Sequence, residues 1–427
     1  MDQGILLQNR TLFRGMLGMI LVALVIGSIG MVIRFSEGLR VTNLGSIIPW
    51  GLWVGFYIYF IGLSAGSFLL STLVYVFRLE KYEPLGRLAL FQALICLVIG
   101  LLFVFIDLGH PWRFYMVYIS QNWHSVLEWE IHFYLLYIVL LAAELHLVMR
   151  EDFRLLAERK RGVRRFVYRL LSLWADAPTP RIRERAATVL KVCGIIGIPT
   201  AIAVHGGTGA IFAVVKARPY WYSSLFPVIF LVSALVSGGG LMLFLRAFFF
   251  SNETPEERDM LAGLGKMTGG LLALDLLLLS IETLVGFYGD IPEHVATLRM
   301  IMFNGRYAWA FWILQVAIGT ILPLIIFLSG RASRSVAALG FAGLSIVVGI
   351  VSVRMNIVIP ALALAILPGL TEAYHNIRLD AVYAPSLVEW LTTIFALGLF
   401  ALLLVAGLRL LPLGKNRFWQ RATLAEE

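Results

Sequence analysis

Ten long apolar stretches dominate this sequence and limit the folds that are open to it. Each is long enough to cross about 30 Å of hydrocarbon as an α-helix that rises about 1.5 Å per residue. Only 14% of the 427 residues are charged, against roughly a quarter in soluble domains. The sequence therefore predicts an all-α polytopic membrane protein of about ten transmembrane helices, with spans at residues 15–35, 46–77, 87–108, 125–149, 189–215, 222–248, 266–288, 306–329, 335–360 and 385–411.

The first apolar stretch is expected to stay in the protein as a spanning helix. It is about 20 residues long, as a full crossing requires. No small-residue cleavage site follows it, as a secretory signal peptide would have. We therefore predict no cleavable leader.

Lysine and arginine residues predict the orientation of the chain. Segment 150–187 carries Arg150, Arg154, Arg159, Lys160, Arg161, Arg164, Arg165, Arg169, Arg181, Arg183 and Arg185. Cationic loops stay on the cytoplasmic side, and the remaining loops on this side and both tails (including Lys415, Arg417 and Arg421) are also basic. We therefore expect a multi-pass protein of the cell inner (cytoplasmic) membrane with both termini cytoplasmic. The net charge of +9 fits loops that touch anionic lipid, so no nucleic-acid partner is expected.

The chain is expected to form a single integral membrane domain over residues 1–427, with an internal repeat. Gly62-Leu-Ser-Ala-Gly-Ser-Phe-Leu-Leu in the second span resembles Ala234-Leu-Val-Ser-Gly-Gly-Gly-Leu-Met in the sixth, and both spans run in the same direction. This favours a first four-helix bundle over 46–215 and a second over 222–360, in parallel repetition, with two flanking helices. Small residues in such stretches let helix backbones approach closely.

Residues 151–187 are expected to form a basic cytoplasmic amphipathic segment. Its apolar residues from Phe153 to Trp174 fall near helical spacing, and Pro178 and Pro180 end the pattern. Such a helix lies at the membrane surface. Docking of a cytoplasmic partner is the alternative.

Polar side chains inside the spans are few, and most fall in the outer half of the membrane. A charge at membrane depth is costly unless it is paired or hydrated, so each marks a candidate functional position. The candidates are Asp107 and Arg113 around the end of the third span, Glu128 and Glu130 in the fourth, His205 in the fifth, Asp275 and Glu282 in the seventh, and Arg354 and Asn356 in the ninth. Acid and base groups in apolar walls near one membrane face suit a quinone, which needs hydrogen bonds to its carbonyls and a route for its protons.

Each of these candidates also has a structural interpretation. Arg354 could form an ion pair with Glu282, and Asp107 and Arg113 could fix the turn after the third span. Glu128 and Glu130, two residues apart on a helix, cannot both face one direction. Outside the cluster, we expect Glu144 and His146 to be solvated at the cytoplasmic surface, and His124, His294 and His375 to be solvated in outer loops.

Neither a metal centre nor an iron–sulfur cluster is expected in this chain. It has only two cysteines, Cys96 and Cys193, whereas a cluster needs about four thiolates. A di-haem site needs four axial histidines, and only His132, His146 and His205 lie in spans. One haem between His132 and His205 is the remaining alternative; we expect no haem.

Three motifs resemble the polysulfide reductase membrane subunit family, also called the NrfD family. They are Pro49-Trp-Gly-Leu-Trp-Val-Gly-Phe, Gly62-Leu-Ser-Ala-Gly and Asp107-Leu-Gly-His-Pro-Trp-Arg-Phe-Tyr. The resemblance covers nearly the whole chain. The branch that is most similar is the hydrogenase-2 type, through Ser125-Val-Leu, His205-Gly-Gly-Thr-Gly, Glu282 and Arg354. His110 stands where many members have arginine.

The resemblance implies a cofactor-free, quinone-reactive anchor beneath a ferredoxin-like iron–sulfur subunit on the periplasmic side. That subunit would in turn bind a further catalytic or cytochrome subunit. Some members are proposed to conduct protons, which makes Asp275 a candidate proton relay.

We therefore expect the quinone-reactive membrane subunit of a respiratory oxidoreductase complex, which is not catalytic alone. Menaquinone or ubiquinone would be its exchangeable substrate. His205 or Arg354 would bind a quinone carbonyl and Glu282 or Glu130 would pass its proton, while Asn356, Glu128, Asp107 and Arg113 would add quinone contacts. The alternatives are a secondary transporter, which a midplane Asp275 would suit, and a purely structural membrane anchor.

Overall fold

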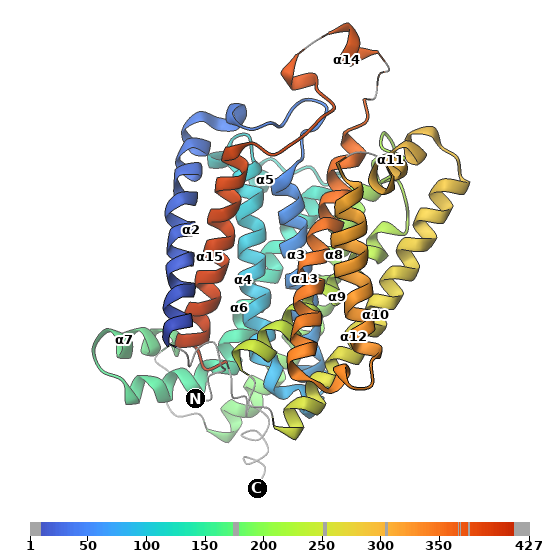
Figure 1. The fold of residues 1–427 in the computed structure, drawn as a ribbon. Coiled ribbons are helices and arrows are strands. Elements are labelled where there is room, and N and C mark those ends of the chain that lie inside the picture. Colours follow the sequence, from blue (N-terminus) through green and yellow to red (C-terminus); the bar gives the residue numbers. More distant parts are fainter. Residues whose placement is uncertain are drawn as a thin grey trace.

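Helices account for all the regular secondary structure in the part of the chain that the computed structural model describes. That part comprises residues 10–173, 179–250, 254–303, 306–365, 367, 369–374 and 376–413. The helices run roughly parallel to one axis and form a single bundle, with short helices at its two ends (Figure 1).

Ten helical segments of the described chain are long and apolar enough to cross a membrane, which confirms the predicted number. They are α2 (Arg10–Glu37), α3 (Leu52–Tyr75), α4 (Glu83–Asp107), α6 (Val126–Arg159), α8 (Pro180–Ala213), α9 (Phe226–Phe249), α10 (Pro255–Tyr288), η4 with α12 (Ala310–Ile321 and Leu322–Leu328), α13 (Val336–Leu362) and α15 (Leu387–Leu410).

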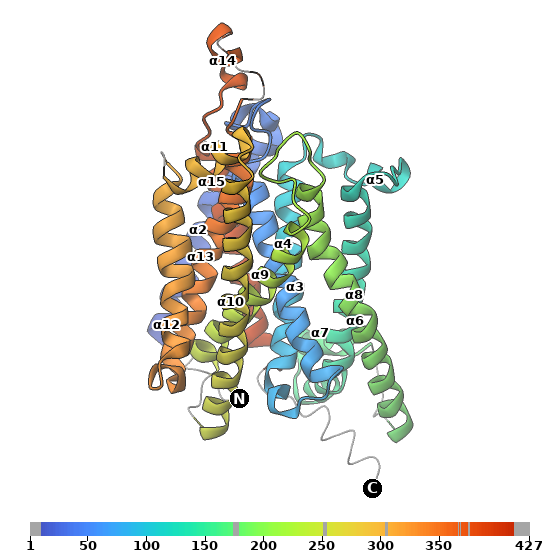
Figure 2. The same cartoon turned by 90° about the vertical axis from the view of Figure 1, so that its right-hand side faces the viewer.

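Short helices connect the spans at both ends of the bundle. At one end lie η1 (Gly38–Val41), η3 (Pro111–Arg113), α5 (Met116–Ile119), α11 (Pro292–Met302), α14 (Leu370–Ala373) and η6 (Ile377–Leu379); at the other lie η2 (Glu80–Tyr82), α7 (Gly162–Leu171) and η5 (Ala332–Arg334). Figure 2 shows α11 and α14 at the end opposite to α7. We call the α7 end the basic end and the other the outer end.

Several helix starts follow directly from the sequence. Thr179 and Thr254 each precede a proline, and their side chains accept a hydrogen bond from the backbone N–H three residues later. Proline suits the first helical position because its missing N–H would have no partner there. At the start of α15, Ser386 and Glu389 form a reciprocal capping box.

Two helices at the centre, α3 and α9, cross at the residues that the internal repeat aligns. A methyl group on Gly66 would meet the backbone of Ala234 and Gly238, and one on Gly238 would meet the backbone of Gly66 and Ser67. Gly66 and Gly238 occupy the same position in the two copies of the repeat. Glycine at both positions lets the two backbones touch.

The remaining helices pack around this central pair. α3 also contacts α4 and α8, and α9 also contacts α8, α10 and α13. α6 packs on α8, while η4 and α12 pack on α13. α2 and α15 pair with each other at one side (Figure 1). The division into two four-helix bundles stays a prediction.

The structure corrects several predicted boundaries. The second span begins at Leu52, since Pro49 and Trp50 precede the helix. The basic segment is not one helix: α6 continues to Arg159 and a separate α7 begins at Gly162, which has a positive φ of 60°. Trp174, Pro178, Lys415, Arg417 and Arg421 lie outside the described residues.

The eighth span differs most from the expected α-helix, because residues Ala310–Ile321 form a π-helix. Pro323 follows in the first turn of α12. A proline has no N–H to give to the carbonyl four residues earlier, and its ring crowds that carbonyl. The π-helix ends at Ile321, two residues before Pro323, whose missing N–H cannot make the α-helical hydrogen bond to the carbonyl four residues earlier.

Candidate functional site

A histidine and an arginine meet in the interior, where α3, α8, α9 and α13 come together. His205 of α8 and Arg354 of α13 each have 0% exposure. The aromatic ring of Phe230 lies against both: its centroid is 4.8 Å from the Arg354 guanidinium carbon and 5.6 Å from the His205 ring centroid. Arg354 donates one hydrogen bond, to the Ser233 hydroxyl at 3.0 Å.

Most of the polar atoms of this pair lack a hydrogen-bond partner among the described residues. Both ring nitrogens of His205 are in this state, although the ring lies near the backbone of Phe230. So are Nε and one terminal nitrogen of Arg354. A buried polar atom without a partner costs about 1–3 kcal/mol, and more when the group is charged. These four atoms can therefore bind the polar groups of a ligand.

Gly62 of α3 borders both side chains. A methyl group at this position would lie 3.2 Å from Cε1 of His205 and 3.4 Å from a terminal nitrogen of Arg354. These distances are tighter than ordinary van der Waals contact. Glycine therefore keeps the wall of the pair free of a side chain.

A buried carboxyl group lies one helical turn away along α8. Glu130 of α6 is 2% exposed and accepts hydrogen bonds from Tyr57 at 2.9 Å, from Tyr134 at 2.7 Å and from Thr208. The hydroxyl oxygens of Tyr57 and Tyr134 also lie 2.6 Å apart, so the two phenol protons are shared among three contacts. Three hydroxyl donors surround one carboxyl group, an arrangement that can hold a proton or pass it on.

Two helices, α8 and α3, contribute residues both to the surroundings of His205 and to the group around Glu130. Thr208 follows His205 by three residues on α8, and Tyr57 precedes Gly62 by five on α3. The structure therefore brings three predicted residues into one neighbourhood: His205, Arg354 and Glu130. A ligand carbonyl bound by His205 or Arg354 would have a carboxyl and two phenols within about one helical turn.

Asp275 of α10 lies near Arg354. It is 4% exposed, its Oδ1 lacks a partner among the described residues, and it interacts electrostatically with Arg354. The Asp275 carboxyl thus partly balances the charge of the Arg354 guanidinium. Asp275 joins the neighbourhood through Arg354 rather than through a hydrogen bond.

Two other predicted residues have partners of their own. Glu282 accepts a hydrogen bond from Ser223 at 2.9 Å, and the ion pairs of the described residues include none between Glu282 and Arg354. Asn356 donates to Gln315 of the π-helix at 3.2 Å and to Ser352 at 3.3 Å. Neither is joined to His205 by any contact that we observe.

Some of the other histidine and acidic side chains are more buried than the sequence predicts. His124 is exposed, as expected, whereas Glu144 is 1% exposed and His294 is 8% exposed. Burial lowers the pKa of His294, whose ring packs against Tyr220 at 5.7 Å. His146 is only partly exposed, and His375 lies outside the described residues. His132 faces Tyr118 and Trp123 rather than His205.

A family model provides the comparison that decides the classification. The model described as polysulphide reductase, NrfD, matches residues 40–366, about three quarters of the chain. The chain belongs to the NrfD family. The resemblance drawn from the three motifs is thereby confirmed.

Several relatives match this chain over most of its length. A selenate reductase subunit of Mesobacillus selenatarsenatis is 44% identical over 91% of both chains. A putative dimethyl sulfoxide reductase membrane subunit of Halobacterium salinarum is 31% identical over 94% of this chain and 92% of its own. The Hdr-like menaquinol oxidoreductase integral membrane subunit of Archaeoglobus fulgidus is 29% identical over 92% and 91%. The probable hydrogenase 2 b-type cytochrome subunit of Escherichia coli is more distant, at 25% identity over 74% of each chain.

The NrfD motif that begins at Asp107 forms the outer end of α4. Asp107 interacts electrostatically with Arg34, whose guanidinium donates to the carbonyls of Ile106 at 2.9 Å and Leu108 at 2.7 Å. A surface cavity of about 430 Å³ lies beside it, and its lining includes Arg34, His110 and exposed Arg113. The structure therefore places Asp107 and Arg113 in a neighbourhood of their own, apart from His205.

Glu128 is buried like Glu130 but points elsewhere. It is 5% exposed, its Oε1 lacks a hydrogen-bond partner among the described residues, and it lies 4.0 Å from Nδ1 of His132. The two glutamates do diverge, as their spacing predicts, yet both are buried. Helix packing therefore covers both glutamates.

Sequence reasoning missed Tyr57, Tyr134, Thr208 and Ser233. Tyr134 lies four residues after Glu130, and Thr208 three after His205, which is the spacing of neighbours on one helix face. This spacing could have identified Tyr134 and Thr208 from the sequence. Tyr57 and Ser233 reach the site from other helices, so only the packing identifies them.

Proposed function

We propose that this chain is the quinone-reactive membrane subunit of a respiratory oxidoreductase complex. The observation that carries the proposal is the fully buried His205–Arg354 pair: both imidazole nitrogens and two of the three guanidinium nitrogens lack partners among the described residues. Two relatives support the choice of ligand, since one is named as a menaquinol oxidoreductase subunit and another as a menaquinone reductase subunit.

In this proposal the residues divide the work between binding and proton transfer. Arg354 and His205 donate hydrogen bonds to a quinone carbonyl, and Gly62 leaves room for the ring. Glu130 exchanges the proton through the hydroxyls of Tyr57 and Tyr134. The residues present fit a quinone, because orphaned donors and a hydroxyl-bound carboxyl lie within about one helical turn of each other.

The proposed electron partner is an iron–sulfur subunit docked at the outer end, on the periplasmic side, with a further catalytic or cytochrome subunit beyond it. The basic end, with α7, would face the cytoplasm of the inner membrane. Within the described residues, no three histidine, cysteine, aspartate or glutamate side chains gather as metal ligands would. We propose that the clusters belong to the partner.

The complex purified in mild detergent with its co-purifying subunits tests this assignment. We expect His205→Ala to lower turnover of a short-chain quinol such as menadiol at least tenfold, because the site loses a donor to the carbonyl, while the same subunits still co-purify. His124→Ala is the matched control, since His124 lies exposed in an outer loop. It should keep wild-type turnover.

The outcomes separate the proposal from its rivals. Normal quinol turnover in the His205→Ala complex would refute the site, and an intact complex inert toward every quinol would support a structural anchor. A secondary transporter is the second candidate, favoured by the buried Asp275 with an unpartnered oxygen. Solute uptake by the chain alone in liposomes would favour it over the quinone-reactive subunit.

A further inference from the structure

The buried face of α6 carries polar groups well beyond the proposed quinone site. Glu130, Tyr134, Tyr137, Glu144 and Asp152 follow one another at spacings of four, three, seven and eight residues, which keeps them on one face of a helix. The first four are at most 3% exposed. At about 1.5 Å per residue, Glu130 and Glu144 are roughly 21 Å apart along the helix axis.

Glu144 is the unexplained member of this row. It is 1% exposed, and its Oε1 has no hydrogen-bond partner in the described part of the chain. Tyr137 and Cys193 are the groups that interact with it electrostatically. Burying a carboxyl in the inner half of a membrane protein without an ion pair is costly, so it needs a functional reason.

Polar groups of α3 and α4 occupy the level between Tyr137 and Glu144. The Tyr137 hydroxyl donates to the Ser64 carbonyl at 3.2 Å. One turn further along α3, Ser67 accepts a hydrogen bond from the Gln92 amide, whose Oε1 is buried without a partner in the described structure. The roughly 10 Å between Tyr137 and Glu144 also holds apolar side chains, since Phe68 and Leu141 belong to the same buried cluster as Tyr137. A proton route through this interval therefore needs water at the level of Ser67 and Gln92.

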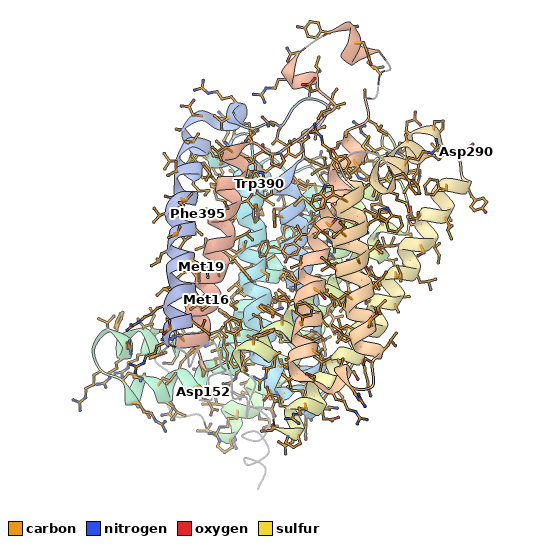
Figure 3. The ribbon with its side chains drawn as sticks, in the orientation of Figure 1. Met16, Met19, Asp152, Asp290, Trp390 and Phe395 are labelled. Atoms are coloured by element: carbon orange, nitrogen blue, oxygen red, sulfur yellow. The ribbon has the colours of Figure 1, made fainter. Side chains whose placement is uncertain are left out.

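The row reaches solvent at the basic end. Asp152 is 17% exposed and forms an ion pair with Arg87 at 2.6 Å. Figure 3 labels Asp152 at the end of the bundle where α7 lies. Arg87 also donates to the carbonyl of Val148 at 2.9 Å, which fixes the pair against α6 between Glu144 and the surface.

We propose that this face of α6 conducts protons between the basic end and the quinone site, with Glu144 as the intermediate carrier. The proposal rests on the quinone function above. Each quinone reduced takes up two electrons and two protons, and each quinol oxidised releases them. The electrons pass to or from the iron–sulfur partner, while the protons move through Asp152, Glu144, Tyr137 and Tyr134 to Glu130. Glu144 ends each turnover in the protonation state in which it began.

This route differs from the relay that the resemblance implies. Asp275 lies on α10 beside Arg354, whereas the proposed route uses α6 with polar groups from α3 and α4. The two can be separated by substitution. Glu144→Gln removes the ionisable group of α6 and keeps its shape, and Asp275→Asn does the same on α10.

The experiment uses the intact complex in liposomes that contain a pH-sensitive dye, with menadiol and a one-electron dye acceptor. We expect Glu144→Gln to lower both quinol turnover and the number of protons moved per electron at least tenfold. We expect its solvent deuterium isotope effect to rise, because proton transfer becomes limiting. Glu144→Asp should recover turnover to within about threefold of wild type. Asp275→Asn should leave proton movement per electron unchanged.

Glu158→Gln is the matched control, since Glu158 lies on the same helix but is 59% exposed; it should behave as wild type. Wild-type proton movement per electron in the Glu144→Gln complex would overturn the proposal. If that variant fails to assemble, Tyr137→Phe decides, and unchanged turnover and proton movement there would overturn it equally. Turnover lost in His205→Ala but kept in Glu144→Gln would refute this route alone, whereas a wild-type complex inert toward quinol would refute the quinone function as well.

Discussion

Two arginines inside this bundle illustrate why residue type alone does not define a site. Arg34 is 1% exposed and donates to two backbone carbonyls at the end of α4, which makes it a structural group. Arg354 is equally buried, yet two of its nitrogens lack partners among the described residues. Both are cations in apolar stretches of the sequence. Only the structure shows that Arg354 has N–H donors without an acceptor among the described residues.

The hydroxyls around Glu130 give a prediction at the same scale. Tyr134→Phe removes a hydrogen bond to the carboxyl, and a bond to a charged group is worth about 1.5–3 kcal/mol. We expect quinol turnover of the intact complex to fall roughly tenfold or more, with every subunit still present. Tyr222→Phe, at an exposed outer position, is the control. Equal rates in the two variants would mean that Glu130 takes no part in turnover.

For His205, Arg354 and Glu130, the sequence could predict a similar depth in the membrane but not that they are neighbours. Their spans and orientation place all three in the outer half, and the structure adds which helix faces meet. The sequence could not separate them from Glu282 and Asn356, because those residues lie at similar depth. Only the structure shows that these two bond to Ser223 and Gln315 and have no contact with His205 among the described residues. Burial of Glu144 was missed for the same reason, since helix packing on α6 decides it.

Among the elements, the ten spans were predictable because hydrocarbon thickness sets a minimum length for each apolar stretch. The π-helix was not, although Pro323 is visible in the sequence. Within it, Thr320 bonds to the Gln315 carbonyl at 2.9 Å and Gln315 accepts from Asn356. The wide turn thus directs Gln315 toward α13, and π-turns of this kind are frequent at functional sites.

The crossing of α3 and α9 gives a prediction for whole elements. Gly66→Leu would force the two helices apart, because even a methyl group there meets the backbone of α9. Overpacking costs about 1–3 kcal/mol, so we expect the thermal unfolding temperature of the complex to drop by several degrees. Gly270→Leu is the control, since the space around Gly270 is open. A similar drop in both variants would contradict the importance of the crossing.

At the scale of the whole molecule, charge separates the two ends of the bundle. The basic end holds α7, whose apolar residues Val163 and Phe166 are 79% and 61% exposed beside several arginines. Such a face suits the surface of an anionic leaflet. This distribution favours a cytoplasmic basic end, as the loop charges predict.

Labelling from one side of the membrane tests this orientation. Arg161→Cys should react with a membrane-impermeant maleimide only in inverted vesicles, and His124→Cys only in intact cells or spheroplasts. The two native cysteines lie within spans, Cys96 buried and Cys193 half-buried, so the background should be low. The reverse pattern would invert the topology, and with it the side proposed for the iron–sulfur partner.

The pairing of α2 with α15 has a consequence for how the protein is made. Glycines 27 and 30 of α2 lie against Phe395 and Leu391 of α15, and much of the remaining α2 surface is apolar and outward-facing. About 350 residues separate the two helices along the chain. At a synthesis rate of about 5–20 residues per second, a ribosome needs roughly 20–70 s to produce the second after the first. During that time α2 resides in lipid without its final neighbour, so an insertase or chaperone that shelters it would speed biogenesis.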